Sequence, residues 1–442
     1  MGWAGDIPPL HGDRKGRKSL PQAILAVLAL GALILASSTA SQTPAPVSAS
    51  PSAAMIEKGR YLAIVGDCNG CHTRAGGSYL AGGFPLNTPF GVIYSANITP
   101  DKDTGIGSWT LADFQRSMSQ GKDDQKHNLY PAMPYPSYTH VTVADDAAIF
   151  AYLKSVTPVN YTPPANKLPF PLTVRPLVSF WNWLYLKRGP IAPPPQASVQ
   201  WARGAYIVRG LGHCGACHTP KTLLQGDKSD DALQGGTLDN WFAPDLNGDR
   251  RSGLASWTAA DIVEYLKTGR NARSSASGSM AREIAFSTSK LTDTDLAAIA
   301  TYLKSLPAAK AAPEPPRLNA NVMTEGKAIY VDECSACHKM DGSGVPRFFA
   351  PLVGSSNVQS PNPTSIDHVI LTGTRMPATD TRPTQLAMPA FAWKLNDQEV
   401  AAVATYIRNS WGNVAPTVSA DQVGDVRSKV AAHPVRKPPS KV

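Results

Sequence analysis

The sequence predicts a mainly α-helical protein built from three tandem domains. Its 442 residues are about the length of three ordinary domains. A Cys-x-x-Cys-His pentad occurs three times and uses all 6 cysteines. Similar helix-like segments recur on both sides of each pentad, as in a chain of repeated units. We predict a leader, three domains that we call repeats 1, 2 and 3, and a tail, with boundaries at 1–40, 41–190, 198–307, 320–413 and 414–442.

The pentads point to covalently bound haem. They span Cys68–His72, Cys214–His218 and Cys334–His338. In this pattern two thiols bond to the porphyrin and the next histidine becomes an axial ligand of the iron. The thiols are those of Cys68, Cys71, Cys214, Cys217, Cys334 and Cys337, and the proximal ligands are His72, His218 and His338. Zinc sites and thioredoxin-like pairs also use Cys-x-x-Cys, but three copies that each continue into histidine favour three haems c. Each repeat is therefore predicted to be a class I cytochrome c-like domain.

Each repeat is expected to open and close with a helix. The opening segments are 57–61, 202–206 and 325–330, and the closing segments are 149–155, 299–305 and 403–409. The closing helices begin with the spacing of a capping box, at Thr142 with Asp145, Thr292 with Asp295 and Asn396 with Glu399. Repeats 1 and 2 share a middle helix that follows Trp109 or Trp257. Each indole either donates to a haem propionate or packs as an aromatic at a helix start.

Composition changes mark the connections between the repeats. The proline-rich stretches 157–171, 190–195 and 307–316 are expected to be semi-rigid spacers that set the distances between haems. The tail at 414–442 is basic, contains proline and shows no hydrophobic period, so it is predicted to be disordered.

The N-terminus is typical of an export signal. Basic residues at 14–18 precede an apolar run at 23–36 and small residues near Ala40. The run is too short for a comfortable membrane span, which favours cleavage near Ala40 over an uncleaved anchor. No later stretch is long enough to cross a bilayer. Export agrees with haem attachment and predicts a periplasmic protein.

The net charge does not indicate a nucleic-acid partner. The formal charge is +9, and about +7 remains without the leader. Three haems would add six propionates and bring the protein close to neutrality.

A methionine thioether is the usual second axial ligand of such haems. Met280 is the only methionine of repeat 2, and it follows His218 at almost the same sequence separation as Met133 follows His72 in repeat 1. The competitor in repeat 1, Met118, falls on the predicted middle helix. Most methionines are core residues, so spacing and neighbouring prolines, more than residue type, support these two assignments.

Repeat 3 offers Met376 and Met388, each followed by proline. Met388 precedes the tyrosine of its closing helix by nearly the same separation as the predicted methionines of the other two repeats, whereas Met376 lies much farther from that tyrosine. We therefore predict Met388. The histidines His127, His140 and His368 remain spare candidates, and His213 is too close to its own pentad to reach the opposite face of the ring.

Four stretches carry a resemblance to a known family. They are residues 97–107, 129–136, 212–220 and 388–391. Over residues 55–413 the chain resembles the tri-haem cytochrome c subunits of membrane-bound, quinone-reducing dehydrogenases of acetic acid bacteria. The resemblance implies a separate, large catalytic subunit that contains pyrroloquinoline quinone, flavin or molybdenum, and it implies ubiquinone as acceptor at the periplasmic face of the cytoplasmic membrane. Residues 168–183 resemble cytochromes that are paired with molybdenum-containing aldehyde oxidisers. Alcohol or aldehyde is the expected substrate class.

The expected role is an electron-transfer subunit that is not catalytic alone. The chain has no nucleotide-binding glycine motif and no flavin or molybdenum site. A free periplasmic multihaem carrier to a terminal oxidase is the alternative, and a peroxidase would need an open distal position on one iron. The aromatic stretch 180–188 ends in a basic pair, and it is expected to contact either the membrane surface or a protein partner.

Overall fold

The computed structural model describes residues 51–308 and 318–432, so the predicted leader lies outside the described residues. The described chain is mainly helical, with short antiparallel strand pairs, which confirms the predicted class. Repeat 1 contains α1 (Ala53–Val65), α2 (Cys68–His72), β1 (Pro85–Thr88), β2 (Gly91–Tyr94), α3 (Leu111–Gln120), α4 (Tyr135–Tyr138), α5 (Val143–Ser155), a short η1 (Arg175–Leu177) and α6 (Val178–Tyr185).

Repeat 2 follows the same plan, whereas in repeat 3 the strand pair comes just before the closing helix. Repeat 2 contains α7 (Val199–Tyr206), the π-helical turn η2 (Ile207–Leu211), α8 (Gly215–His218), η3 (Ser229–Asp231), β3 (Gln234–Leu238), β4 (Trp241–Asp245), α9 (Ala259–Thr268), α10 (Gly278–Phe286), η4 (Thr288–Lys290) and α11 (Asp293–Lys304). Repeat 3 contains α12 (Ala320–Glu333), α13 (Ser335–His338), α14 (Ser356–Gln359), α15 (Thr364–Thr372), β5 (Thr374–Arg375), β6 (Ala387–Met388) and α16 (Asp397–Arg408), and α17 (Ala420–Ala432) comes after it.

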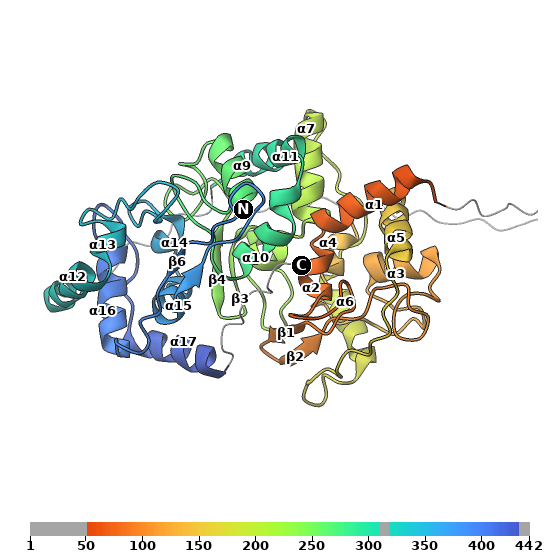
Figure 1. Cartoon of the computed structure of the whole chain (residues 1–442), viewed down its shortest axis with the longest axis horizontal. Helices are drawn as coiled ribbons and strands as arrows, with labels where there is room; N and C mark the ends of the chain where they lie inside the picture. The colour runs from red at the N-terminus through yellow and green to blue at the C-terminus, as the bar shows by residue number, and fades with distance from the viewer. Residues whose placement is uncertain (1–50, 309–317, 433–442) are drawn as a thin grey trace, which may run out of the picture. The chain divides into compact units, whose positions relative to one another are not determined.

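The opening and closing helices of each repeat cross at a glycine. Helix α1 packs against α5, α7 against α11, and α12 against α16 (Figure 1). The crossing residues are Gly59, Gly204 and Gly326. A Cβ atom at these positions would lie 1.9, 2.0 and 2.2 Å from the carbonyl oxygens of Ala148, Ala298 and Ala402, respectively. Only glycine permits such a close backbone approach, so three separate parts of the sequence build the same crossing.

The predicted helix starts are confirmed. The side chains of Thr142, Thr292 and Asn396 each accept a hydrogen bond from the backbone three residues later, as the capping-box spacing indicates. The middle helices α3 and α9 start with complete capping boxes. Repeat 3 has a corresponding helix, α15, which begins after Pro363 with no side-chain cap and therefore lacks the sequence signal.

Repeats 1 and 2 are joined by an extensive interface. A single buried apolar cluster contains residues of both repeats. The Tyr61 hydroxyl donates to Asp295 at 2.7 Å, and the equivalent Tyr206 hydroxyl donates to the equivalent Asp145 at 2.6 Å. Such a reciprocal exchange is the signature of a local two-fold relation. The interface, more than a spacer, therefore fixes the distance between these two pentads.

The first proline-rich stretch is part of repeat 1, which corrects our expectation of a spacer at 157–171. Lys167 and Val92 exchange backbone hydrogen bonds at 3.0 and 2.8 Å, and the Val159 carbonyl accepts from the Asn97 amide at 2.8 Å. An extended chain can pair with the edge of the β1–β2 hairpin wherever its own N–H groups are free to donate. Of the third stretch, residues 309–317 lie outside the described part of the chain.

The prediction of a disordered tail is wrong for residues 420–432, which form α17. Ser419 and Gln422 cap this helix by hydrogen-bonding each other's backbone. Val423 and Val426 are buried, and Val430 packs beside them against repeat 3. Their spacing of three and four residues is a helical period that the basic composition of the tail obscured. Within the described residues, no helix is both long enough and apolar enough to span a membrane.

Candidate haem sites

The pentads lie on short helical turns just after the opening helices. In repeat 1 the whole pentad forms α2, and the last residues of the other two pentads form α8 and α13. On a helical turn, residues three apart point to the same side. The two thiols of each pentad can therefore reach one edge of a porphyrin.

The three pentad histidines make the same hydrogen bond through Nδ1. The acceptors are backbone carbonyl oxygens: Ala96 at 2.7 Å for His72, Pro244 at 2.7 Å for His218 and Ala350 at 2.8 Å for His338. A metal-binding histidine characteristically donates its second ring N–H in this way, which leaves Nε2 for the metal. Burial lowers the pKa of each imidazole and favours the neutral form that binds iron.

These acceptors could not be found from the sequence. They follow the pentad histidines by 24, 26 and 12 residues. Because they are backbone atoms, residue type carries no signal for them. They come from the segments after the pentads, which return to the histidine side of each site.

Each predicted methionine packs against the same apolar cluster as a pentad cysteine. Met133 and Cys68 pack against the same buried cluster, as do Met280 and Cys214. In repeat 3, Met388 and Cys334 pack against a separate cluster. All three methionines are only partly buried. Each repeat thus brings a thiol and a thioether that are far apart in the sequence to one apolar core.

The competing methionines are engaged elsewhere. Met376 is buried, and its sulfur accepts a hydrogen bond from Arg270 of repeat 2 at 3.8 Å. Met118 is a buried core residue of α3. Neither residue has the partly exposed thioether shared by the three predicted ligands.

The spare histidines also have other contacts. His127 is exposed and pairs with Asp123, and His140 Nδ1 contacts the Gly189 carbonyl at 2.5 Å. His368 stacks on Trp241 with 3.9 Å between ring centroids, at the contact of repeats 2 and 3. His213 packs edge-on against Tyr138. Each of the four imidazoles therefore has a contact of its own within the protein.

The donor set fits haem better than zinc. In the described ranges, no three histidine, cysteine or acidic side chains converge on one point as a structural zinc site requires. Paired thiols, a histidine with its Nδ1 engaged and a thioether at an apolar core are the groups that a c-type haem uses. Trp257 is buried and packs edge-on against Tyr265. Its possible bond to a propionate stays a prediction.

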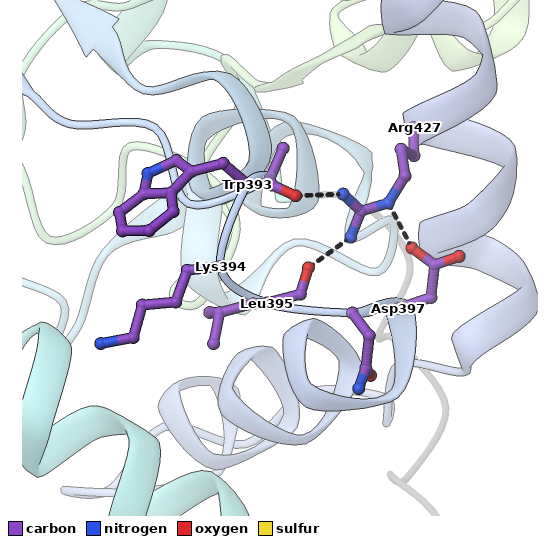
Figure 2. Close-up of a pocket in the computed structure, with 7 residues that line it drawn as sticks. Trp393, Lys394, Leu395, Asp397 and Arg427 are labelled. Atoms are coloured by element: carbon purple, nitrogen blue, oxygen red, sulfur yellow. Dashed lines mark hydrogen bonds and ion pairs between the residues drawn. The ribbon is translucent and has the colours of Figure 1, made fainter.

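A surface hollow near Met388 is structural. It is lined by Ala392, Trp393, Lys394, Leu395, Asn396, Asp397 and Arg427 (Figure 2). The Arg427 guanidinium bonds to the Asp397 carboxylate at 2.6 Å and to the Ala392 and Leu395 carbonyls at 2.9 and 2.7 Å. No pentad residue and no predicted methionine lines it. Helix α17 thus holds the loop between Met388 and α16 in place.

Comparison with known proteins identifies the family. The sequence matches the cytochrome c family over residues 202–307 and 323–411. It is 42% identical over 406 residues to the gluconate 2-dehydrogenase cytochrome c subunit of Pantoea cypripedii, covering 86% of this chain and 91% of that protein. The chain belongs to the family of dehydrogenase cytochrome c subunits.

Other relatives are cytochrome subunits of dehydrogenases that are named for different substrates. The cytochrome c subunit of the alcohol dehydrogenase (quinone) of Gluconacetobacter polyoxogenes is 40% identical over 419 residues, or 89% of this chain and 87% of that one. The fructose dehydrogenase cytochrome subunit of Gluconobacter japonicus is 35% identical over 436 residues, or 92% and 89%. These matches confirm the predicted resemblance and the electron-transfer role. The relatives are, by their names, subunits of dehydrogenases.

Proposed function

We propose that this dehydrogenase cytochrome c subunit binds three haems c, one in each of three tandem class I domains at 41–190, 198–307 and 320–413. Thioether bonds form at the six pentad cysteines. The axial pairs are His72 with Met133, His218 with Met280 and His338 with Met388. The observation that supports this most strongly is the hydrogen bond from histidine Nδ1 to a backbone carbonyl, which occurs in all three pentads.

Bound haem c supplies one-electron transfer between its ferric and ferrous states. The chain's own residues orient the ligands and exclude water. The Nδ1 bonds hold the imidazoles in one tautomer, and the apolar clusters support the methionine side chains from one side. The glycine crossings keep each repeat compact.

We propose that the chain relays electrons from a large catalytic subunit to ubiquinone at the periplasmic face of the cytoplasmic membrane. Oxidation of the substrate releases two electrons, which pass singly along the chain. These two electrons, together with two protons, convert ubiquinone to ubiquinol. The relatives' names, with alcohol, gluconate and fructose as substrates, support a small hydroxylated or carbonyl substrate, and alcohol or aldehyde is our choice. Export by a leader at 1–40, cleaved near Ala40, completes this proposal.

Deleting the gene for this chain tests the relay. Oxygen uptake by washed membranes on the partner's substrate should be lost, because no route to quinone remains. Dye-linked oxidation by the catalytic subunit should partly survive, because an artificial acceptor bypasses the relay. Ethanol, acetaldehyde and gluconate are tried in turn, and a strain that carries the gene on a plasmid is the control. Normal oxygen uptake on every substrate in the deletion strain would refute the relay.

An exposed apolar surface is the best candidate for membrane contact. We call it the α6 patch; its exposed side chains are Phe170, Leu177, Phe180, Trp183, Leu184, Leu223 and Leu224. Helix α6 is joined to the 222–229 loop by the Trp181 indole, which donates to the Leu224 carbonyl at 2.8 Å. Trp181 therefore faces inward, contrary to its expected place in the anchor. Exposed aromatics and leucines beside Lys187 and Arg188 are the composition of an interfacial anchor.

Substituting Phe180 and Trp183 by serine should weaken binding to anionic phospholipid vesicles about 100-fold, from about 3 kcal/mol of lost apolar burial. Flotation of the purified holoprotein measures this, and three haems per chain should remain. Trp393→Ser is the control, since Trp393 is 82% exposed but lies outside the patch. Unchanged flotation of the double variant would place the anchor elsewhere and leave the α6 patch to a protein partner.

A further inference from the structure

Helix α10 carries the predicted iron ligand of repeat 2 on one side, and on its other side it contacts the pentad of repeat 1. Met280 packs into the core of repeat 2. Arg282 lies two residues later, and on a helix residues two apart point to nearly opposite sides. Its guanidinium donates to the carbonyl oxygen of Gly70, inside the repeat 1 pentad. One nine-residue helix therefore connects the first and second predicted haem sites directly.

Two aromatic rings support the Arg282 guanidinium at this contact. The guanidinium carbon lies 3.9 Å from the ring centroid of Phe84, a residue of repeat 1, and 5.5 Å from that of Phe286. Phe286 is one turn along α10, so the cation lies against two aromatic faces while it bonds to the pentad. Arginine suits such a position because its planar guanidinium can stack and donate at the same time.

The pentad segment is equally well held from its own side. Asp67, immediately before Cys68, has φ of 45° and caps α2 by accepting from the Gly70 amide at 3.2 Å. A Cβ atom at Gly70 would lie 2.0 Å from the Asp67 carboxylate. Further contacts come from repeat 2, where the Ser287 hydroxyl bonds to the Val65 carbonyl at 3.4 Å and His213 Nε2 lies 3.3 Å from the Gly66 carbonyl. The turn has little freedom to move independently of repeat 2.

We propose that Arg282 is a positioning residue for electron transfer, which locks the repeat 1 pentad onto α10 and sets the electrostatic environment of the haem bound there. This inference rests on the proposed haem sites. The positive charge of Arg282 stabilises the reduced, less positive state of that haem. The hydrogen bond and ring contacts of Arg282 hold the two sites at a constant separation. The sequence gives no hint of this role, because Arg282 and Gly70 are 212 residues apart.

The test is a potentiometric titration of the holoprotein, with the three haems followed by their visible bands. A Cys68→Ala/Cys71→Ala variant identifies the wave of the first haem by its absence. In Arg282→Gln that wave should move to lower potential, with about a fivefold smaller equilibrium constant for reduction, the size expected when a nearby unit charge is removed in a medium of intermediate dielectric constant. Electron equilibration between the first two haems, after laser-flash reduction with a ruthenium complex, should slow.

Two further variants separate the outcomes. Arg282→Lys keeps the charge and should restore the potential, which a merely structural role would not predict. Arg347→Gln makes the same charge change at the contact of repeats 2 and 3, where Arg347 pairs with Glu264, and should leave the first haem unchanged. Three haems with an unshifted first wave in Arg282→Gln would overturn the role of Arg282. Fewer than three haems in the unaltered protein would instead refute the proposed haem sites.

Discussion

Replacing Met280 by alanine is expected to remove about one third of the thioether–iron(III) absorption band of the oxidised protein. The band arises only where a methionine sulfur binds ferric iron, and the proposal assigns one methionine to each of three haems. The vacated position should become high-spin or bind water, and the potential of that haem should fall because the thioether favours the ferrous state. Near-infrared absorption measures the band, electron paramagnetic resonance the spin state, and a potentiometric titration of the purified holoprotein the potential.

Two other methionines provide matched controls. Met376→Ala and Met118→Ala remove buried thioethers of the same type, one bonded to Arg270 and one in the core of α3. Both variants should keep the full band although they lose some stability. If Met376→Ala loses a third of the band and Met388→Ala does not, the ligand of repeat 3 has been misassigned. High-spin signals in the unaltered protein would revive the peroxidase alternative.

Substituting Gly326 by alanine should destabilise repeat 3 by about 3 kcal/mol or more. The new methyl group would lie 2.2 Å from the Ala402 carbonyl oxygen and 2.8 Å from the Tyr406 Cβ, so α12 and α16 would have to move apart. Neither neighbour is the flexible end of a long side chain. Denaturant unfolding, followed at the haem absorption bands, should show a lower midpoint for repeat 3. The share of the thioether–iron(III) band that Met388 contributes should be lost first.

Gly424→Ala makes the same substitution in a helix without the crossing. There the nearest atom to the new methyl group would be an Asp397 carboxylate oxygen at 3.2 Å, which needs to shift by only a few tenths of an ångström. The better helix propensity of alanine, worth up to about 1 kcal/mol, should offset the tight contact and leave stability nearly unchanged. Equal losses in the two variants would show that the destabilisation of Gly326→Ala is not caused by the helix crossing.

Local chemistry explains why so much of the proposed haem assignment could be predicted from the sequence. Pentads such as Cys214–His218 are contiguous, so both thiols and the proximal histidine are defined within one short segment. The capping residues Thr142 and Asn396 act on the backbone three positions away, and the structure confirms both helix starts. The proposed roles of Met133 and Met280 rest on a comparison of repeat spacing. Met388 needed the same comparison between two candidates, and only the structure showed its rival bonded to Arg270.

The sequence by itself determined the pentads, the helical class, the repeated helix pairs and the resemblance to dehydrogenase cytochrome subunits, because each depends on residues that are adjacent or regularly spaced. Tertiary structure alone decided the carbonyl partners of the histidines, the shared core of repeats 1 and 2 with its reciprocal tyrosine–aspartate bonds, and the grip of Arg282 on Gly70. It also showed α17 packing on repeat 3, where composition indicated disorder. These features join backbone atoms or side chains far apart in the chain, and such contacts form only when apolar burial brings distant segments together.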